Sequence, residues 1–367
     1  MGLTAGIVGL PNVGKSTLFN AITKAGALAA NYPFATIDPN VGVVEVPDER
    51  LDKLSELVQP KKTVPTIFEF TDIAGIVKGA SKGEGLGNKF LSHIREVDAI
   101  VQVVRAFEDP NVTHVDGSVD PIRDIETINL ELIFADLEVV EKRLPKIEKK
   151  AIMKVDPESV EEYRLLSAIH DVLLSDKPIR TMRLNDNEKR FLKHFNFLTL
   201  KPMVYVANID ENDIADYDDN PYVKQIARFA GDDASDMVVI SAKIESELSE
   251  LDDDEKTMFL EELGVSESGL DQLIKHSYAL LGLETFFTAG PKEVRAWTFR
   301  HGSKAPTCAG IIHSDFEKGF IRAETIKYPD YIAFGGEHGA KEAGKMRLEG
   351  RDYVVQDGDV LHFLFNL

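Results

Sequence analysis

The chain has 367 residues, of which 43% are hydrophobic, so it is long enough to bury two or three domain cores. Its formal net charge of −20 at pH 7 argues against general, charge-driven binding to nucleic acids. A single cysteine, Cys308, excludes an internal disulfide, and no apolar run reaches the length of a membrane span, so we expect a cytoplasmic protein without a membrane partner.

The first predicted elements are a buried strand and a phosphate-binding loop. Thr4–Gly9 is apolar, and Gly9-Leu-Pro-Asn-Val-Gly14-Lys15-Ser16 matches the pattern G-x-x-x-x-G-K-[ST] in full, just before a helix-like run. The glycines let the backbone curl so that its N–H groups and the helix N-terminus face phosphate oxygens. Lys15 would reach the β- and γ-phosphates. The predicted nucleotide contacts of this loop are Asn12, Val13, Gly14, Lys15, Ser16 and Thr17.

Two further segments can complete the site for Mg²⁺ and the γ-phosphate. Asp72-Ile-Ala-Gly75 follows the strand candidate Ile67–Thr71. Asp72 there can hold the shell of Mg²⁺, and the Gly75 amide can bond the γ-phosphate and so respond to hydrolysis. Thr36 can close over the γ-phosphate and the metal, or it can be a loop threonine with no ligand. The predicted metal ligands are Ser16, Thr36 and Asp72, and the predicted catalytic groups here are Lys15 and Gly75.

A long insertion separates the strand candidates Ala99–Val104 and Val204–Asn208. It carries a heptad seam of apolar residues spaced alternately three and four apart. We favour an inserted antiparallel helical arm over one long helix packed on the main domain, because the insertion is long and its other faces are charged. Helical candidates follow at Val160–Leu174 and Asn187–Phe195, and Pro145 predicts a kink or a helix restart. The seam residues are Leu130, Ile133, Leu137, Val140, Leu144, Ile147 and Ala151.

Basic residues gather on this arm of an otherwise acidic protein. They lie among Glu138, Glu141 and Glu148, so two interpretations stay open: a solvated helix face, or a contact for RNA. The basic residues are Lys142, Arg143, Lys146, Lys149, Lys150 and Lys154.

Two loops after later strand candidates are placed to contact the nucleotide base. Guanine-binding relatives of this motif series use Asn-Lys-x-Asp, whose aspartate accepts bonds from guanine N1–H and the 2-amino group. Here Ile209 and Glu211 replace the lysine and the aspartate, whereas the Asn208 amide can bond N7 and the 6-amino group of adenine at once. The change favours ATP without excluding GTP. The predicted base contacts are Asn208, Ile209, Glu211, Ser241, Ala242 and Lys243.

After about Gly282 the pattern changes to short strand candidates separated by glycine turns, which predicts a small β-rich module. Gln356–Asp359 predicts a tight turn between the last two strands. Before this region, the acidic run Asp252–Glu255 is typical of a solvated loop. The strand candidates of the module are Val294–Phe299, Gly319–Ile321, Asp352–Val355 and Val360–Phe365. Those of the first domain are Thr4–Gly9, Val41–Val46, Ile67–Thr71, Ala99–Val104, Val204–Asn208 and Met237–Ser241.

The ordered motifs resemble the translation-factor-related GTPases and, more narrowly, the Obg-like ATPases of the YchF family, over essentially the whole chain. The resemblance implies an α/β P-loop NTPase fold. Its parts are a Ras-like G domain with a mostly parallel sheet (1–125 and 201–281), an inserted helical coiled-coil arm (126–200) and a C-terminal β-grasp domain of the TGS type (282–367). Besides Asn-x-x-Glu at 208–211, the stretches that carry it are Asn31-Tyr-Pro-Phe-Ala-Thr-Ile-Asp-Pro-Asn40, Asp72-Ile-Ala-Gly-Ile-Val-Lys-Gly-Ala80 and Gly83-Glu-Gly-Leu-Gly-Asn-Lys89.

The resemblance also implies ATP hydrolysis in preference to GTP, and association with the large subunit or the whole ribosome. Many relatives place a glutamine after D-x-x-G to orient the attacking water, but this chain has Ile76. His114 is the water-positioning residue that the resemblance suggests instead. Asn12 is the family feature that accompanies K⁺ beside the β–γ bridge, so the expected cofactors are Mg²⁺ and K⁺.

We therefore expect a monomeric ATPase that hydrolyses ATP to ADP and phosphate as a conformational switch on the ribosome, with rRNA contacted through the basic arm. Three alternatives stay open. The chain could be a GTPase of the Obg type in which Glu211 reads guanine, or a nucleotide-gated binding protein in which hydrolysis is incidental. A phosphotransferase is the third, although nothing in the sequence resembles a domain for an acceptor substrate.

Overall fold

The computed structural model describes residues 3–25, 40–74, 86–115 and 117–366, which form two compact units. The first unit comprises Met1–Val44 and Glu69–Ser277, and the second comprises Glu45–Phe68 and Tyr278–Leu367. The sequence pattern did not associate residues 45–68 with the C-terminal module. Over these described ranges, no helix combines the length and the apolar character that crossing a bilayer requires.

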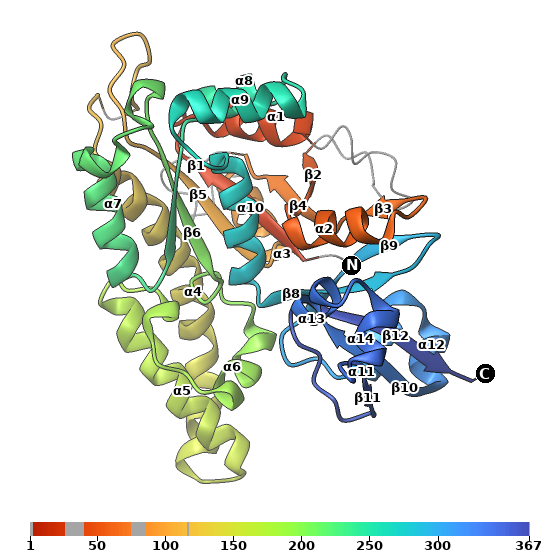
Figure 1. Ribbon diagram of the computed structural model, residues 1–367. Helices are drawn as coiled ribbons and strands as arrows, with labels where there is room; N and C mark the ends of the chain where they lie inside the picture. The colour runs from red at the N-terminus through yellow and green to blue at the C-terminus, as the bar shows by residue number, and fades with distance from the viewer. Residues whose placement is uncertain (1–2, 26–39, 75–85, 116, 367) are drawn as a thin grey trace. The chain divides into compact units, whose positions relative to one another are not determined.

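The first unit is built on a six-stranded sheet, counted over the described residues, with the strand order β2-β4-β1-β5-β6-β7. Strand β1 pairs in parallel with β4 and β5, and the parallel pairing continues through β6 to β7 (Figure 1). The predicted, mostly parallel sheet is confirmed. The strands are β1 (Thr4–Gly9), β2 (Val41–Glu45), β4 (Ile67–Asp72), β5 (Ala99–Arg105), β6 (Met203–Asn208) and β7 (Asp236–Ile240).

Helices cover this sheet, and β5 and β6 are buried along their whole length, as strands covered on both faces must be. The acidic run at 252–255 is not the predicted loop. Asp252 caps the next helix by accepting from the Glu255 N–H at 2.9 Å, and the Glu255 carboxylate accepts from the Asp252 N–H in return. The helices are α1 (Lys15–Ala25), α3 (Leu86–Glu96), α7 (Pro221–Asp232), α8 (Ala242–Leu248), α9 (Asp253–Leu263) and α10 (Gly269–Leu280).

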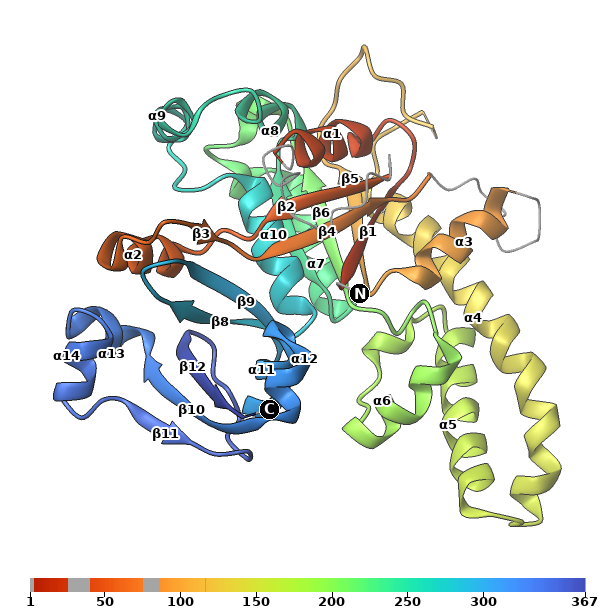
Figure 2. The same cartoon turned by 90° about the vertical axis from the view of Figure 1, so that its right-hand side faces the viewer.

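The insertion forms the predicted helical arm. Helix α4 (Pro121–Ile152) and helix α5 (Pro157–Leu174) lie side by side and extend away from the sheet of the first unit (Figures 1 and 2). Seam residues Ile133, Val140 and Ile147 are buried in a shared core with α5. The arm continues through η3 (Ile179–Thr181), α6 (Asp186–Leu192) and η4 (Lys193–Phe195).

Of the kink or helix restart predicted at Pro145, the restart does not occur: α4 is one continuous helix across this residue. Proline removes one N–H from the helix and its ring pushes against the preceding turn. Pro145 lies exposed on the outer side of α4, while the buried seam on both sides of it packs against α5. This packing holds the two halves of α4 in one helix.

The second unit has its own six-stranded sheet among the described residues, with the order β11-β10-β12-β8-β9-β3. Asp352–Val355 is not a strand, since Val354 makes only an isolated bridge with Lys304. Strand β8 was not predicted. The strands are β3 (Thr63–Val64), β8 (Leu283–Ala289), β9 (Val294–Arg300), β10 (Phe320–Lys327), β11 (Arg347–Glu349) and β12 (Asp359–Phe365). The helices are α2 (Glu49–Val58), α11 (Ala305–Ile312), α12 (Ser314–Lys318), α13 (Tyr328–Ala333) and α14 (Glu337–Glu342).

Candidate active site

The loop between β1 and α1 has the backbone that a phosphate-binding loop needs. Asn12 and Gly14 have left-handed φ angles of 64° and 95°. A Cβ at Gly14 would lie 2.2 Å from Asn208 Nδ2, so only glycine fits there. The loop surrounds a hollow of about 380 Å³, lined by Gly9, Leu10, Pro11, Asn12, Gly14, Lys15, Ser16 and Thr17.

The predicted phosphate lysine and the predicted magnesium aspartate meet at this hollow. Lys15 Nζ donates to the Asp72 carboxylate in a partly buried ion pair. Asp72 is brought there by the register of β1 and β4, in which Ile7 lies beside it. A triphosphate would offer Lys15 its oxygens, and Mg²⁺ would offer Asp72 a cation, so ligand binding can replace this pair. Thr36, Gly75 and Ile76 lie outside the described residues.

The donors around the loop suit Mg²⁺ bound together with phosphate. In the part of the chain that the structure describes, no cluster of three or more His, Cys, Asp or Glu side chains could hold a metal by itself. Mg²⁺ prefers hard oxygen ligands and is commonly bound through one or two carboxylates plus substrate phosphates. The exposed Ser16 hydroxyl and the Asp72 carboxylate provide that kind of partial set.

Asn208, at the end of β6, joins two loops of the site. Its Nδ2 donates to the Val13 carbonyl at 2.8 Å, and its Oδ1 accepts from the Ala242 N–H at 2.9 Å. The side chain is buried. One amide hydrogen and one oxygen lone pair are left over for a base. The residue predicted to contact the base therefore also fixes the phosphate loop to the segment Ser241–Lys243.

The other predicted base contacts divide into buried and accessible groups. Ile209, Ser241 and Ala242 are buried, whereas Glu211 and Lys243 are accessible and form an ion pair with 2.5 Å between Lys243 Nζ and Glu211 Oε2. The hydrogen bond to Glu211 raises the pKa of Lys243. Glu211 thus already has a cationic partner.

A buried carboxylate holds the helix that begins within the segment Ser241–Lys243. Glu245, on α8, accepts from the Gly269 N–H at 2.8 Å at the start of α10. Burial raises the pKa of Glu245 to about 7. The arrangement ties α8, which begins at Ala242, to the start of α10.

His114 lies in the loop between β5 and α4, as predicted, and its loop contacts the phosphate loop. Asn12 Nδ2 donates to the Thr113 carbonyl at 3.1 Å. The His114 side chain is buried, with Nε2 at 2.8 Å from Asp124 Oδ2 and Nδ1 at 3.5 Å from Arg123 Nη2. Sequence analysis did not identify Asp124 or Arg123, because a charged pair in the first turn of a helix is common.

Arg105, another residue that the motifs do not include, shapes this loop. It is fully buried, and its guanidinium donates to the carbonyls of Phe107 at 3.0 Å, Val112 at 2.9 Å and Asp109 at 3.3 Å. An arginine can be buried without a large energetic cost when its N–H groups have hydrogen-bond acceptors. The sequence feature that could have identified Arg105 is its place directly after the largely apolar strand candidate Ala99–Val104.

The basic cluster of the arm is smaller than its sequence suggests. Lys142 pairs with Glu138, and Arg143 Nε lies 2.5 Å from Glu162 Oε1, so both charges are balanced locally. The remaining four members are exposed on α4 and on the turn after it. They are Lys146, Lys149, Lys150 and Lys154.

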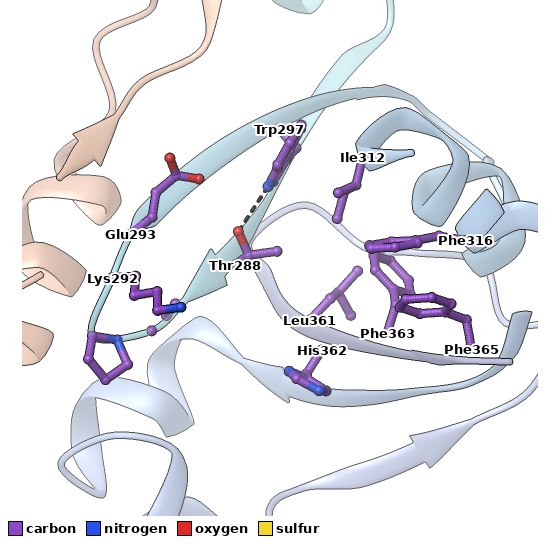
Figure 3. A pocket seen from close by; sticks show the side chains of 13 residues that line it. Thr288, Lys292, Glu293, Trp297, Ile312, Phe316, Leu361, His362, Phe363 and Phe365 are labelled. Carbon is purple, nitrogen blue, oxygen red and sulfur yellow. Dashed lines mark hydrogen bonds between the residues drawn. The ribbon is translucent and has the colours of Figure 1, made fainter. Parts of the chain in front are cut away.

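A larger hollow of about 660 Å³ lies in the second unit, and its lining is mainly apolar and aromatic (Figure 3). Aromatic side chains gather at one end, with Phe316, Phe363 and Phe365 close together, while Lys292 and Glu293 lie at the other end. Its lining offers apolar contact and no pairing of a nucleophile with a base. We therefore place the candidate active site at the phosphate loop.

Two family models match this chain. One, described as "50S ribosome-binding GTPase", matches residues 4–142. The other, YchF-GTPase_C, described as "Protein of unknown function (DUF933)", matches residues 283–366.

Full-length relatives are also similar. The chain is 66% identical over 367 residues to a protein of Bacillus subtilis named "Ribosome-binding ATPase YchF", with all of both chains covered. A protein of Haemophilus influenzae with the same name is 56% identical, also over the whole of both chains. A solved structure from Schizosaccharomyces pombe, described as a YchF GTPase, is 41% identical with a TM-score of 0.89, and the match covers 99% of this chain and 98% of that one.

Proposed function

Because this chain belongs to the YchF family, we propose that it is a ribosome-binding ATPase that hydrolyses ATP to ADP and phosphate. The observation that supports this most is the junction of Lys15, Asp72 and the Asn208 amide around one phosphate loop. Full-length relatives that carry the name of that activity support it further. The proposal includes a cytoplasmic, monomeric protein that uses ATP as a conformational switch, with a C-terminal module of the TGS type.

The phosphate loop would hold the triphosphate through its backbone N–H groups and the Lys15 ammonium. Mg²⁺, when bound, neutralises charge on the β- and γ-phosphate oxygens. Ser16 and Asp72 are the described residues that would hold it, with Thr36 as the third proposed ligand and the Gly75 amide on the γ-phosphate. A water molecule attacks the γ-phosphorus, the bond to the bridging oxygen breaks, and ADP leaves with the electron pair. The protons of the water pass to the released phosphate and to solvent.

His114 is the proposed positioning group for that water, since Ile76 cannot form a hydrogen bond through its side chain. Its loop is joined to the phosphate loop through Asn12. The Asn12 Nδ2 is used in that contact, so Oδ1 is the atom of this side chain that would ligate K⁺. A K⁺ ion beside the β–γ bridge would supply positive charge where charge develops in the transition state.

GTP hydrolysis is the second candidate, because the similar fission yeast structure is described as a GTPase. Here the pairing of Glu211 with Lys243 favours ATP. A carboxylate already bonded to an ammonium is a weaker acceptor for guanine N1–H and the 2-amino group. Equilibrium binding of ATP and GTP to the same preparation decides between the two.

We predict that ATP binds more tightly than GTP, and that Ile209→Lys combined with Glu211→Asp moves the preference toward GTP. The shift is modest, because each hydrogen bond to the base contributes on the order of 1 kcal/mol net. Titration calorimetry with both nucleotides measures it. Ile209→Leu is the control, since it keeps an apolar residue at this buried position. A wild-type protein that prefers GTP would contradict the adenine argument.

The arm offers a second test. Reversing the charge of Lys146, Lys149 and Lys150 to glutamate is expected to weaken co-sedimentation with ribosomes and to lower its salt dependence, because fewer phosphate counterions are released. ATP turnover without ribosomes should not change. The matched control reverses Lys189, Arg190 and Lys193, three exposed basic residues of α6 and η4. Equal binding of both triple variants at physiological salt would contradict the RNA contact and favour the interpretation of the α4 lysines as a solvated helix face.

A switch differs from incidental hydrolysis in how the partner responds to the nucleotide. Ribosome binding should differ between a non-hydrolysable ATP analogue and ADP, and hydrolysis should be needed for release. If release proceeds equally with the analogue, the protein is a nucleotide-gated binding module. A search for phosphorylated product in the same reaction tests the phosphotransferase alternative.

A further inference from the structure

The buried contact between His114 and helix α4 carries a further inference. We infer that Asp124 is a positioning residue for His114: it fixes the proton of the imidazole on Nε2 and so leaves Nδ1 as the atom that can accept from water. The inference rests on the proposed role of His114 in hydrolysis and adds a residue from the arm helix to that role.

The contact with Asp124 is the basis for assigning the ring proton to Nε2. His114 Nε2 and Asp124 Oδ2 are 2.8 Å apart, and both side chains are almost completely buried, at 4% and 3% exposure. An ionised carboxylate only accepts hydrogen bonds, so Nε2 must donate. The neutral ring then has its lone pair on Nδ1, where the neighbouring group is a donor: Arg123 Nη2, at 3.5 Å.

The two contacts differ in strength. Arg123 is one-third exposed, and its shorter bond is to the Ser118 carbonyl, at 2.6 Å from the same Nη2 atom. The 3.5 Å contact with Nδ1 is at the limit for a hydrogen bond. The same Nη2 atom also lies 3.4 Å from Asp124 Oδ1, so the guanidinium contacts both members of the pair while Asp124 holds Nε2. A carboxylate behind an imidazole fixes the tautomer and stabilises the ring if it takes up a proton.

Helix α4 is anchored by a buried network a few residues after Asp124. Asn129, farther along α4, donates through Nδ2 to the Tyr205 hydroxyl at 3.1 Å and accepts from Arg180 at 3.0 Å. Arg180 in turn pairs with Asp233 at 2.7 Å, and Tyr205 donates to the same carboxylate at 2.6 Å. This buried network joins α4 to strand β6 and to the end of α7.

The test is Asp124→Asn, which keeps the size of the side chain but can either donate to Nε2 or accept from it. We expect kcat for ATP hydrolysis to fall about tenfold or more, with KM nearly unchanged. Asp120→Ala is the matched control. It removes the cap of the same helix, where Asp120 Oδ1 accepts from the Arg123 N–H at 3.1 Å, without removing the carboxylate at His114. It should lower the melting temperature and keep kcat.

Nitrogen-15 NMR of the histidine rings gives a readout that a merely structural role would not move. The His114 resonances, assigned by their absence in His114→Ala, should show a single tautomer with the proton on Nε2 in the wild type and a mixture in Asp124→Asn. A wild-type ring protonated on Nδ1 would overturn the inference even if the variant failed to fold. So would normal kcat in Asp124→Asn, or an equal loss of kcat in Asp120→Ala.

The same measurements separate this inference from the proposed function. If His114→Ala keeps wild-type turnover, the proposed water-positioning role fails, and Asp124 then positions a ring that does not serve the reaction. If His114→Ala is slow but Asp124→Asn is not, only the role of Asp124 is rejected.

Discussion

Replacing Lys15 by alanine is expected to abolish detectable ATP binding while the fold stays intact. Lys15 is the charged side chain that the phosphate loop directs at the hollow, and its removal takes away charge-assisted bonds worth about 1.5–3 kcal/mol each. The partner that it leaves, Asp72, is one-quarter exposed in its side chain, so water can solvate the carboxylate. Titration calorimetry measures the loss of binding, and circular dichroism checks the fold.

The matched control lies on the same helix. Lys24, at the other end of α1, makes an exposed ion pair with Glu250, with 2.6 Å between Nζ and Oε1. Lys24→Ala removes the same charge from the same helix without touching the hollow, so it should bind ATP like the wild type. An unchanged ATP affinity in Lys15→Ala would overturn the assignment of the phosphate site and, with it, the proposed activity.

The second large effect is expected at His114. His114→Ala should lower turnover about tenfold or more while ATP affinity changes little, because a water-positioning contact is made mainly in the transition state. Steady-state hydrolysis and equilibrium binding, measured on the same preparation, separate the two quantities. Replacing K⁺ by Na⁺ should slow turnover separately if Asn12 helps to hold a monovalent cation.

His276→Ala serves as the control, since this histidine lies exposed on α10 in the same unit. It should leave turnover unchanged. Wild-type turnover in His114→Ala would leave the attacking water without a positioning residue, and activation by the ribosome would become the favoured explanation.

The strands of the first unit and its helical arm could be predicted from the sequence, because the strands and the arm seam have strong periodic patterns. Thr4–Gly9 was predicted to the residue, and the buried side of α4 follows from its heptad spacing. The second unit was harder. Asp352–Val355 has the composition of a strand, but tertiary context leaves it a single bridge. The helix that starts after Asp252 was missed because the acidic run concealed a capping box.

The site divides in the same way. The meeting of motif residues such as Lys15, Asp72 and Asn208 at one loop could be predicted, since their spacing is set by the backbone of the phosphate loop and the ends of strands; their roles toward a nucleotide stay predictions. The contact of Asp124 with His114 could not be predicted, because it depends on where a loop ten residues away folds back. Nor could the pair of Glu211 and Lys243, which joins two loops that are distant in the sequence.

The buried network at Asn129 lies much closer to the Asp124 end of α4 than to the tip of the arm. From Asn129 the helix extends about 8 Å to Asp124 on one side and about 35 Å to Ile152 on the other, at 1.5 Å per residue. If α4 rocks as a rigid rod, the far end travels about four to five times as far as the end beside His114. A force applied at the tip of the arm would therefore be multiplied at the imidazole, where a movement of a fraction of an ångström is enough to change a hydrogen bond.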